Sequence, residues 1–151
     1  MKLSENLSLA EMLRSESAKR KGIINSAPLE HIENMKALAV NVFQPIRNHF
    51  KVPIHISSGY RSNALNDLIG GSKTSQHSKG EAMDIDMDGS QITNNQVFQF
   101  IRANLEFDQL IWEFGTGLNP DWVHVSFSQK KNRKQILIAK KQGGKTVYVN
   151  F

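Results

Sequence analysis

Residues 75–88 read Ser75-Gln76-His77-Ser78-Lys79-Gly80-Glu81-Ala82-Met83-Asp84-Ile85-Asp86-Met87-Asp88, a polar loop that runs into an alternating acidic segment. From Ala82 to Asp88 apolar residues alternate with aspartates, which predicts a strand with an apolar inner face and an acidic outer face. His77 lies in the polar loop before it, and Gly80 permits a tight reversal between loop and strand. His77 and Asp84 can therefore face one point.

A second histidine, His124, follows in the stretch 121–127. Alternation predicts a strand over 122–127 that turns its valines to the core and His124 to the polar face. Two imidazoles and one carboxylate are a ligand set that catalytic zinc uses, with water in the fourth position. The alternative from the residues alone is that His77 is a solvated loop histidine.

The acidic segment also begins like an EF-hand calcium loop, with Asp84, Asp86 and Asp88 at positions 1, 3 and 5 and Gly89 at position 6. Position 12 would be Asn95 in place of a bidentate glutamate, and the polar loop before Asp84 cannot form the entering helix. We therefore prefer the strand.

Around this segment the sequence predicts helices first and strands afterwards. A short helix is expected around Leu9–Arg14, with the basic stretch Ala18–Gly22 interpreted as its stop. Apolar residues at three- and four-residue steps indicate a long helix over 29–46, in which Pro45 predicts a kink or a break. The remaining elements are expected to be a strand over 54–58, helices over 64–69 and 94–104, and strands over 109–114, 122–127 and 135–139, the last paired with 146–149. This order predicts an α+β fold, in which amino-terminal helices pack on a mostly antiparallel sheet that bears the zinc site, in a single catalytic domain over 1–151.

Composition narrows the class of protein. The chain has 151 residues, of which 39% are hydrophobic and 22% charged, as in a soluble globular domain. It has no cysteine, so disulfides and thiolate metal sites are excluded and zinc must be held by histidines and carboxylates. The segment Met1–Asn6 lacks the apolar run of a secretory signal, and no segment approaches the roughly 18 apolar residues of a membrane span. We therefore expect no membrane span and a protein that stays in the cytoplasm until release.

The net charge of +5 is concentrated at the carboxyl end, because residues 129–151 carry seven lysines and arginines and no acid. This basic tail could bind an anionic polymer of the cell wall. The alternative is that its lysines keep a solvated strand edge from aggregating. Its basic residues are not interleaved with aromatic rings as base stacking requires, so no nucleic-acid partner is expected.

Four segments, in order along nearly the whole chain, resemble the M15 family of zinc peptidases, which contains D-alanyl-D-alanine carboxypeptidases and phage endolysins. The resemblance is closest to the branch with the zinc D-Ala-D-Ala carboxypeptidase catalytic domain. The segments are Leu7–Ser15, the turn Ile56–Ser62, the motif from His77 to Asp84 and the strand Trp122–Ser126.

The resemblance implies that His77, Asp84 and His124 ligate zinc, that Asp121 is the general base, and that Arg61 contacts a carboxylate or carbonyl oxygen of the substrate. From the residues alone, Asp121 could equally be a turn-forming residue after Pro120, and Arg61 an ordinary surface arginine. Some family members carry a histidine two residues before the general base, where this chain has Asn119.

Weaker candidates lie beside the motifs. Ser75 could orient His77 or a substrate carbonyl, and Trp122 could form a wall of the substrate groove, or both could simply pack. The other histidines are interpreted as structural (His55) or as helix-surface residues (His31 and His49).

The resemblance implies a metallopeptidase that cuts peptidoglycan stem peptides next to D-amino acids, as a D,D-carboxypeptidase or endopeptidase. An endolysin-type enzyme that acts as a monomer on the cell wall is the expected setting. The alternatives are an L-Ala-D-Glu endopeptidase of the same family and a non-catalytic wall-binding module.

Overall fold

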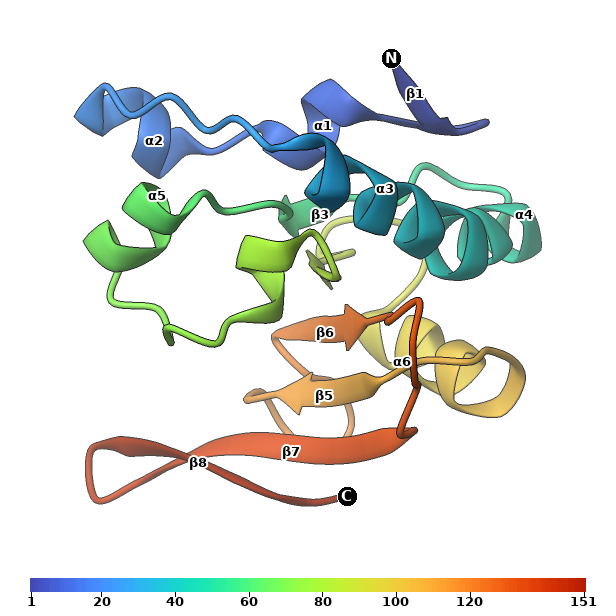
Figure 1. Ribbon diagram of the computed structural model, residues 1–151. Coiled ribbons are helices and arrows are strands. Elements are labelled where there is room, and N and C mark those ends of the chain that lie inside the picture. Colours follow the sequence, from blue (N-terminus) through green and yellow to red (C-terminus); the bar gives the residue numbers. More distant parts are fainter.

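A six-stranded sheet organises the protein in a computed structural model that describes all 151 residues (Figure 1). The strand order is β3-β4-β6-β5-β7-β8, and all neighbours are antiparallel except β5 and β7. The strands are β3 (Ile56–Ser58), β4 (Ala82–Ile85), β5 (Gln109–Glu113), β6 (Trp122–Ser126), β7 (Gln135–Gln142) and β8 (Lys145–Asn150). A small second sheet pairs β1 (Lys2–Ser4) with β2 (Leu7–Ser8). The predicted α+β class and mostly antiparallel sheet are confirmed.

The helices form two groups around the sheet (Figure 1). The first four lie together above β5, β6, β7 and β8 in this view, and α6 packs against β5 and β6. Their bounds are α1 (Leu9–Leu13), α2 (Glu16–Lys21), α3 (Leu29–Leu38), α4 (Gln44–Phe50), α5 (Asn63–Leu68) and α6 (Asn94–Asn104), with a π-helical turn η1 (Ala39–Phe43) and a 3₁₀ turn η2 (Gln76–Lys79). None of these helices has the length and apolar character needed to cross a bilayer.

The predicted long helix over 29–46 is a run of three consecutive segments, α3, η1 and α4. The π turn ends immediately before α4, where the Gln44 amide donates to the Ala39 carbonyl, five residues back. Pro45 follows near the start of α4, where a residue without an amide hydrogen is tolerated. The predicted interruption therefore takes the form of one wide turn.

Two predicted elements differ from the structure. The basic stretch Ala18–Gly22 belongs mostly to the separate helix α2, because Ser15 caps its first turn and Gly22 ends it in the left-handed conformation. The strand that begins at Ala82 ends at Ile85 and does not reach Asp88. Beyond it, the amides of Met87 and Asp88 donate to side chains and not to a neighbouring strand.

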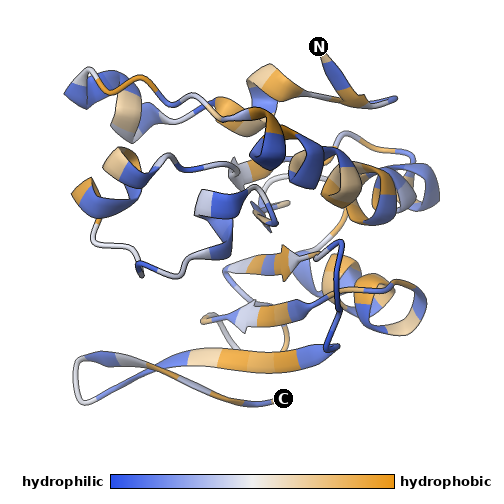
Figure 2. Ribbon diagram, in the orientation of Figure 1, coloured by the Kyte–Doolittle hydropathy of each residue, from blue (hydrophilic) through white to orange (hydrophobic).

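The sheet separates a core face from a polar face. Strands β4, β5 and β6 turn apolar residues to the helices, and Val123 and Val125 of β6 are fully buried there. Figure 2 shows hydrophobic stretches on β5, β6 and β7 and on the side of α6. One apolar cluster runs from Leu3 to Val125 and includes side chains of α3, η1, α4 and α6. The opposite face of the same strands carries Asp84, His124 and Glu113.

Candidate metal centre and substrate cavity

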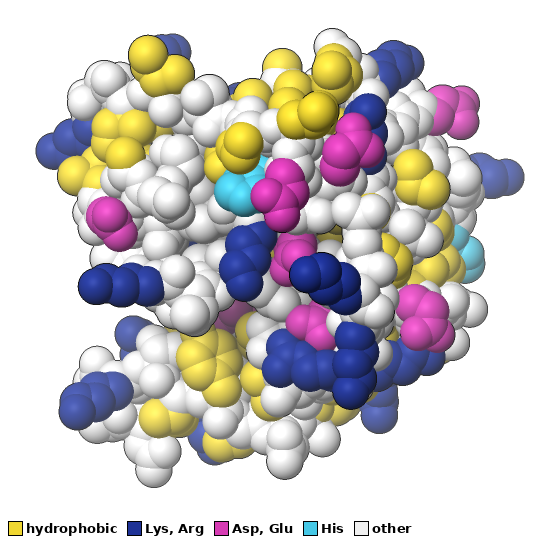
Figure 3. Space-filling model, in the orientation of Figure 1, with side chains coloured by type: hydrophobic (Ala, Val, Ile, Leu, Met, Phe, Trp, Pro, Cys, Tyr) yellow, Lys and Arg dark blue, Asp and Glu magenta, His cyan; other side chains and the backbone are white.

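An open cavity of about 1060 Å³ lies on the polar face of the sheet. Its walls are the segment 70–79 on one side and the β7–β8 hairpin on the other, with the polar faces of β4, β5 and β6 between them. Most of its lining residues are polar or charged. On the face shown in Figure 3, lysine and arginine side chains gather among aspartates and glutamates across the middle of the molecule.

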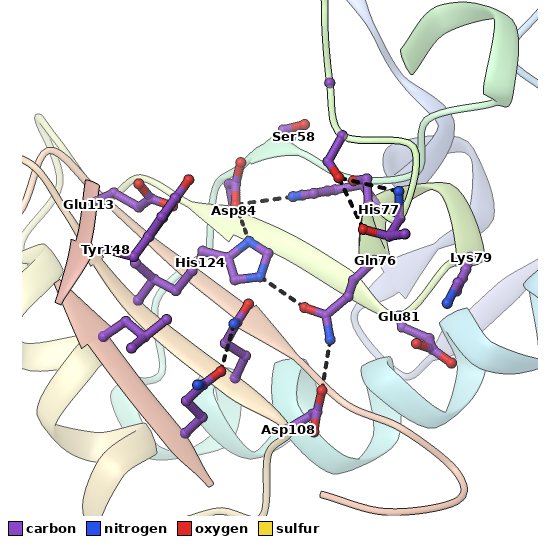
Figure 4. A pocket seen from close by; sticks show the side chains of 18 of the residues that line it. Ser58, Gln76, His77, Lys79, Glu81, Asp84, Asp108, Glu113, His124 and Tyr148 are labelled. Carbon is purple, nitrogen blue, oxygen red and sulfur yellow. Dashed lines mark hydrogen bonds and ion pairs between the residues drawn. The ribbon is translucent and has the colours of Figure 1, made fainter. Parts of the chain in front are cut away.

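Three predicted side chains come together in this cavity (Figure 4): His77 from η2, Asp84 from β4 and His124 from β6. One potential ligand atom of each lies within 4.8 Å of the others. Asp84 Oδ1 is 3.3 Å from His77 Nε2 and 3.1 Å from His124 Nδ1. Asp84 and His124 are direct cross-strand partners, so the β4–β6 register fixes this pair.

Close backbone packing places His77 opposite Asp84. Gly80 ends η2 at φ 76°, and a Cβ built on it would lie 2.4 Å from the His31 carbonyl oxygen of α3. Only glycine fits there, and the chain can turn at once into β4. The Nδ1 atom of His77 lies 2.8 Å from the Gly59 carbonyl oxygen, a contact that places the ring proton on Nδ1. The other ring nitrogen, Nε2, faces Asp84.

A hydrogen-bonded chain extends from the other histidine to the basic tail. His124 Nε2 lies 3.4 Å from Gln76 Oε1, and Gln76 Nε2 donates to Asp108 at 2.8 Å. Arg133 donates to both oxygens of Asp108 at 2.9 Å. Because Gln76 offers its oxygen, the Nε2–H of His124 donates to it, and Nδ1 of His124 faces Asp84. In each histidine, an oxygen acceptor holds one ring nitrogen, and the other ring nitrogen faces Asp84, where it could bind a metal ion.

Several groups in the cavity have shifted pKa values, among them Asp84, Glu113 and Arg61. Burial alone would raise the pKa of Asp84, but the charge of His77 and hydrogen bonds to both histidines hold it well below its usual range. Burial raises the pKa of Glu113 to about 7, with the charge of Asp84 acting in the same direction and His124 opposing it. Burial lowers the pKa of Arg61 below its usual value, although the negative charge of Asp84 acts in the opposite direction.

Arg61 lines the cavity from the turn after β3. Asn25 holds this turn, because its side chain donates to the Tyr60 carbonyl and accepts from the Ser62 amide. The Arg61 amide donates to the His77 carbonyl, which joins the turn to η2. The Nε atom of Arg61 is buried and has no hydrogen-bond partner in the protein. Arg61 therefore has an unused donor beside Asp84.

The remaining predicted residues divide into two groups. Ser75 and Trp122 line the cavity, and the Trp122 ring lies 5.5 Å from that of Phe114. Asp121 is exposed and is not among the lining residues. Asn119 accepts from the Asn95 amide at the start of α6, also outside the cavity.

The histidines outside the cavity have structural contacts. His31 contacts the Tyr60 hydroxyl at 2.9 Å, His49 stacks on Phe100, and His55 contacts the Asp86 carbonyl. The segment from Asp84 to Gly89 is a strand end followed by a turn, without the entering helix of an EF-hand.

The basic tail has contacts of its own. Arg133 pairs with Asp108 and Lys134 with Glu106, so two of its seven cations form ion pairs within the protein. Lys131 and Arg133 line the cavity.

The residues that link His124 to the basic tail, and one buried acid of β5, were not among the site residues predicted from the sequence: Gln76, Asp108, Arg133 and Glu113. For Glu113 a signal existed, because it is the one acid in the apolar strand 109–113 and alternation places it on the same face as Ile111. Gln76, Asp108 and Arg133 lie on three separate segments, and no sequence spacing relates them.

The model of one protein family, described as Peptidase M15, matches residues 5–126, which include all three clustered ligands. No curated protein matches the chain.

Proposed function

Because this chain belongs to the peptidase M15 family, we propose that it is a zinc-dependent peptidase that cuts peptidoglycan next to D-amino acids. The convergence of His77, Asp84 and His124 at the base of an open cavity carries this proposal. We also propose that residues 1–151 form one catalytic domain, since a single apolar core joins both ends of the matched region.

The donor set fits zinc. Two imidazole nitrogens and one carboxylate leave a fourth position for water, as in catalytic zinc sites. Both histidines have their second nitrogen engaged by an oxygen acceptor, which is the usual outer support of such ligands. When bound, zinc lowers the pKa of water and polarises the substrate carbonyl.

The residues around the ligands suit a peptide substrate. The free donors of Arg61 can bind a carboxylate in two places or stabilise the oxyanion that forms at the scissile carbonyl. Trp122 and Phe114 give the cavity an aromatic side against which a peptide can pack. The resemblance also assigns the general base to Asp121, which directly precedes β6, and we propose this role for it.

Purified peptidoglycan sacculi test the function directly. We expect the zinc-loaded protein to release either free D-alanine, as a D,D-carboxypeptidase, or fewer cross-linked dimers, as a D,D-endopeptidase. Mass analysis of the products distinguishes these from the new amino-terminal D-Glu that an L-Ala-D-Glu endopeptidase would leave. Binding to sacculi without any cleavage would contradict the enzyme and support a wall-binding module.

Gln76 is expected to support the metal without binding it. Replacing it with methionine, which has a similar size, removes both the acceptor for His124 and the donor to Asp108. Loss of such an outer partner costs about 10- to 100-fold in metal affinity. Competition with a chromophoric chelator measures the change. The matched control is Gln109→Met, because Gln109 lines the same cavity but pairs with Gln135. Equal zinc affinity in Gln76→Met and the parent would remove Gln76 from the site.

A further inference from the structure

Two lysines that the proposed reaction does not use, Lys79 and Lys131, line one end of the metal cavity. We propose that they form a second substrate subsite, which binds a free carboxylate of the peptidoglycan stem at a distance from the bond that is cut. The subsite is separate from Arg61, which lies near Asp84. This inference rests on the proposed peptidase function and deepens it, because it names an acidic stem peptide as the preferred substrate.

The two lysines come from segments that the fold joins to each other. Lys79 is the last residue of η2, and Lys131 lies in the loop between β6 and β7. Asn34 of α3 connects the two segments, because its side chain donates to the Lys79 carbonyl at 2.8 Å and accepts from the Gln129 side chain at 2.8 Å. Residues far apart in the sequence are thereby brought to the same end of the cavity.

The loop that carries Lys131 is held by its own hydrogen bonds. The Ser128 amide donates to Asn132 Oδ1 at 2.8 Å, and Asn132 Nδ2 donates back to the Ser128 carbonyl at 3.0 Å. The Ser128 hydroxyl accepts from the amides of Lys130 and Lys131. These contacts fix the backbone of Lys131 before any substrate binds, so less of the loop has to be ordered on binding.

Neither lysine is neutralised by an ion pair. Arg133 and Asp108, which line the same end, bind each other, whereas Lys79 and Lys131 are in none of the ion pairs of the structure. The other acid at this end is Glu81, whose pKa is raised by burial although the charge of Lys79 opposes the shift. Two unpaired ammonium groups thus face one unpaired acid, and this end of the cavity attracts an anion.

This end lies a short distance from the candidate metal centre. Gln76 and then Asp108 extend from His124 toward it through two successive hydrogen bonds. In Figure 4, Lys79 lies on the side of the ligands opposite Glu113. An extended peptide advances about 3.3 Å per residue, so a carboxylate a few residues from the scissile bond can reach the lysines while that bond lies at the metal position.

Stem peptides carry carboxylates of this kind. A D-glutamate joined through its side-chain carboxyl keeps a free α-carboxylate, and a diaminopimelate residue beside it carries another. Lysine ammonium groups bind carboxylates through charge-assisted hydrogen bonds. Converting one carboxyl to an amide removes its charge and nearly preserves its shape, so amidated stems are matched probes of the subsite.

The test measures kcat/KM on three stem peptides, prepared as free pentapeptides or as cross-linked dimers according to which the parent cleaves in sacculi. One has both carboxylates free, one has the D-glutamate carboxyl amidated, and one has the diaminopimelate carboxyl amidated. We expect Lys79→Gln/Lys131→Gln to lose about 10-fold on the first peptide, as two exposed ion pairs supply. The loss should be in KM with kcat unchanged, because a remote contact is the same in the ground and transition states. The amidation that abolishes the difference between variant and parent identifies the carboxylate.

The matched control is Lys140→Gln/Lys145→Gln, which removes two exposed lysines of the basic tail that do not line this cavity. It should keep the parent's preference for the free carboxylate, and both double variants should keep the parent's zinc content and melting temperature. Added salt should weaken the preference of the parent, because exposed charges are screened.

Three outcomes overturn the inference: equal kcat/KM of the parent on all three peptides, an equal loss of the Lys79→Gln/Lys131→Gln variant on all three, or the same loss in the control. The last two would assign the lysines to a diffuse attraction for anionic wall polymers. A zinc-loaded parent that cleaves neither the peptides nor sacculi overturns the proposed function itself, whereas cleavage without a preference for the free carboxylate overturns only the subsite.

Discussion

Replacing His77 with alanine is expected to abolish both zinc binding and hydrolysis of peptidoglycan. His77 Nε2 is one of only three ligand atoms that converge in the cavity, and its loss leaves one imidazole and one carboxylate. Two protein ligands are fewer than catalytic zinc sites use. The protein should remain folded, because the apolar core lies on the other face of the sheet from the ligands. Metal analysis and circular dichroism of the purified variant measure the two effects separately.

The matched control for this variant is His55→Ala. His55 is exposed, contacts only the Asp86 carbonyl through its side chain, and does not line the metal cavity. The His55→Ala variant should bind one zinc per chain with the parent's affinity. The zinc assignment is wrong if carefully purified parent protein contains no zinc, or if His77→Ala retains as much zinc as His55→Ala.

Replacing Arg61 with lysine is expected to lower kcat/KM by roughly 100-fold or more, the range reported for the loss of one donor to a developing oxyanion. Lysine keeps the positive charge but lacks the planar pair of donors that binds a carboxylate in two places. Stability should not fall, because the Nε atom that is lost is buried and has no partner in the protein. Steady-state kinetics and thermal melting test both parts of this expectation.

An exposed arginine gives the control for this second prediction. Arg20→Lys changes the same group on α2, away from the cavity, and should leave kcat/KM unchanged. Turnover of Arg61→Lys equal to that of Arg20→Lys would mean that Arg61 supplies no more than a diffuse charge. A large drop in melting temperature would instead assign Arg61 to the fold.

Much of the fold follows from patterns within short segments. Helix α6 begins and ends where the apolar spacing predicts, because amphipathic periodicity is a local property, and the structure shows Thr93 capping its first turn. The β7–β8 pairing follows from the Gly143-Gly144 turn between two apolar runs. Helix α2 was missed because its sequence is nearly all polar. Only its caps at Ser15 and Gly22 mark it as a helix.

The candidate site divides in the same way. Alternation along β4 and β6 assigns Asp84 and His124 to the polar face, and the family resemblance adds His77, so the sequence by itself determined the three proposed ligands. Two-residue alternation along a strand predicts which face of the sheet a side chain occupies, but it does not predict which strands are neighbours. Placing Glu113 on the same face of the sheet as Asp84 and His124, and joining Gln76, Asp108 and Arg133, required the order β4-β6-β5-β7. Only the tertiary structure decided these contacts, because they depend on pairing between strands far apart in the chain, including the parallel pairing of β5 with β7.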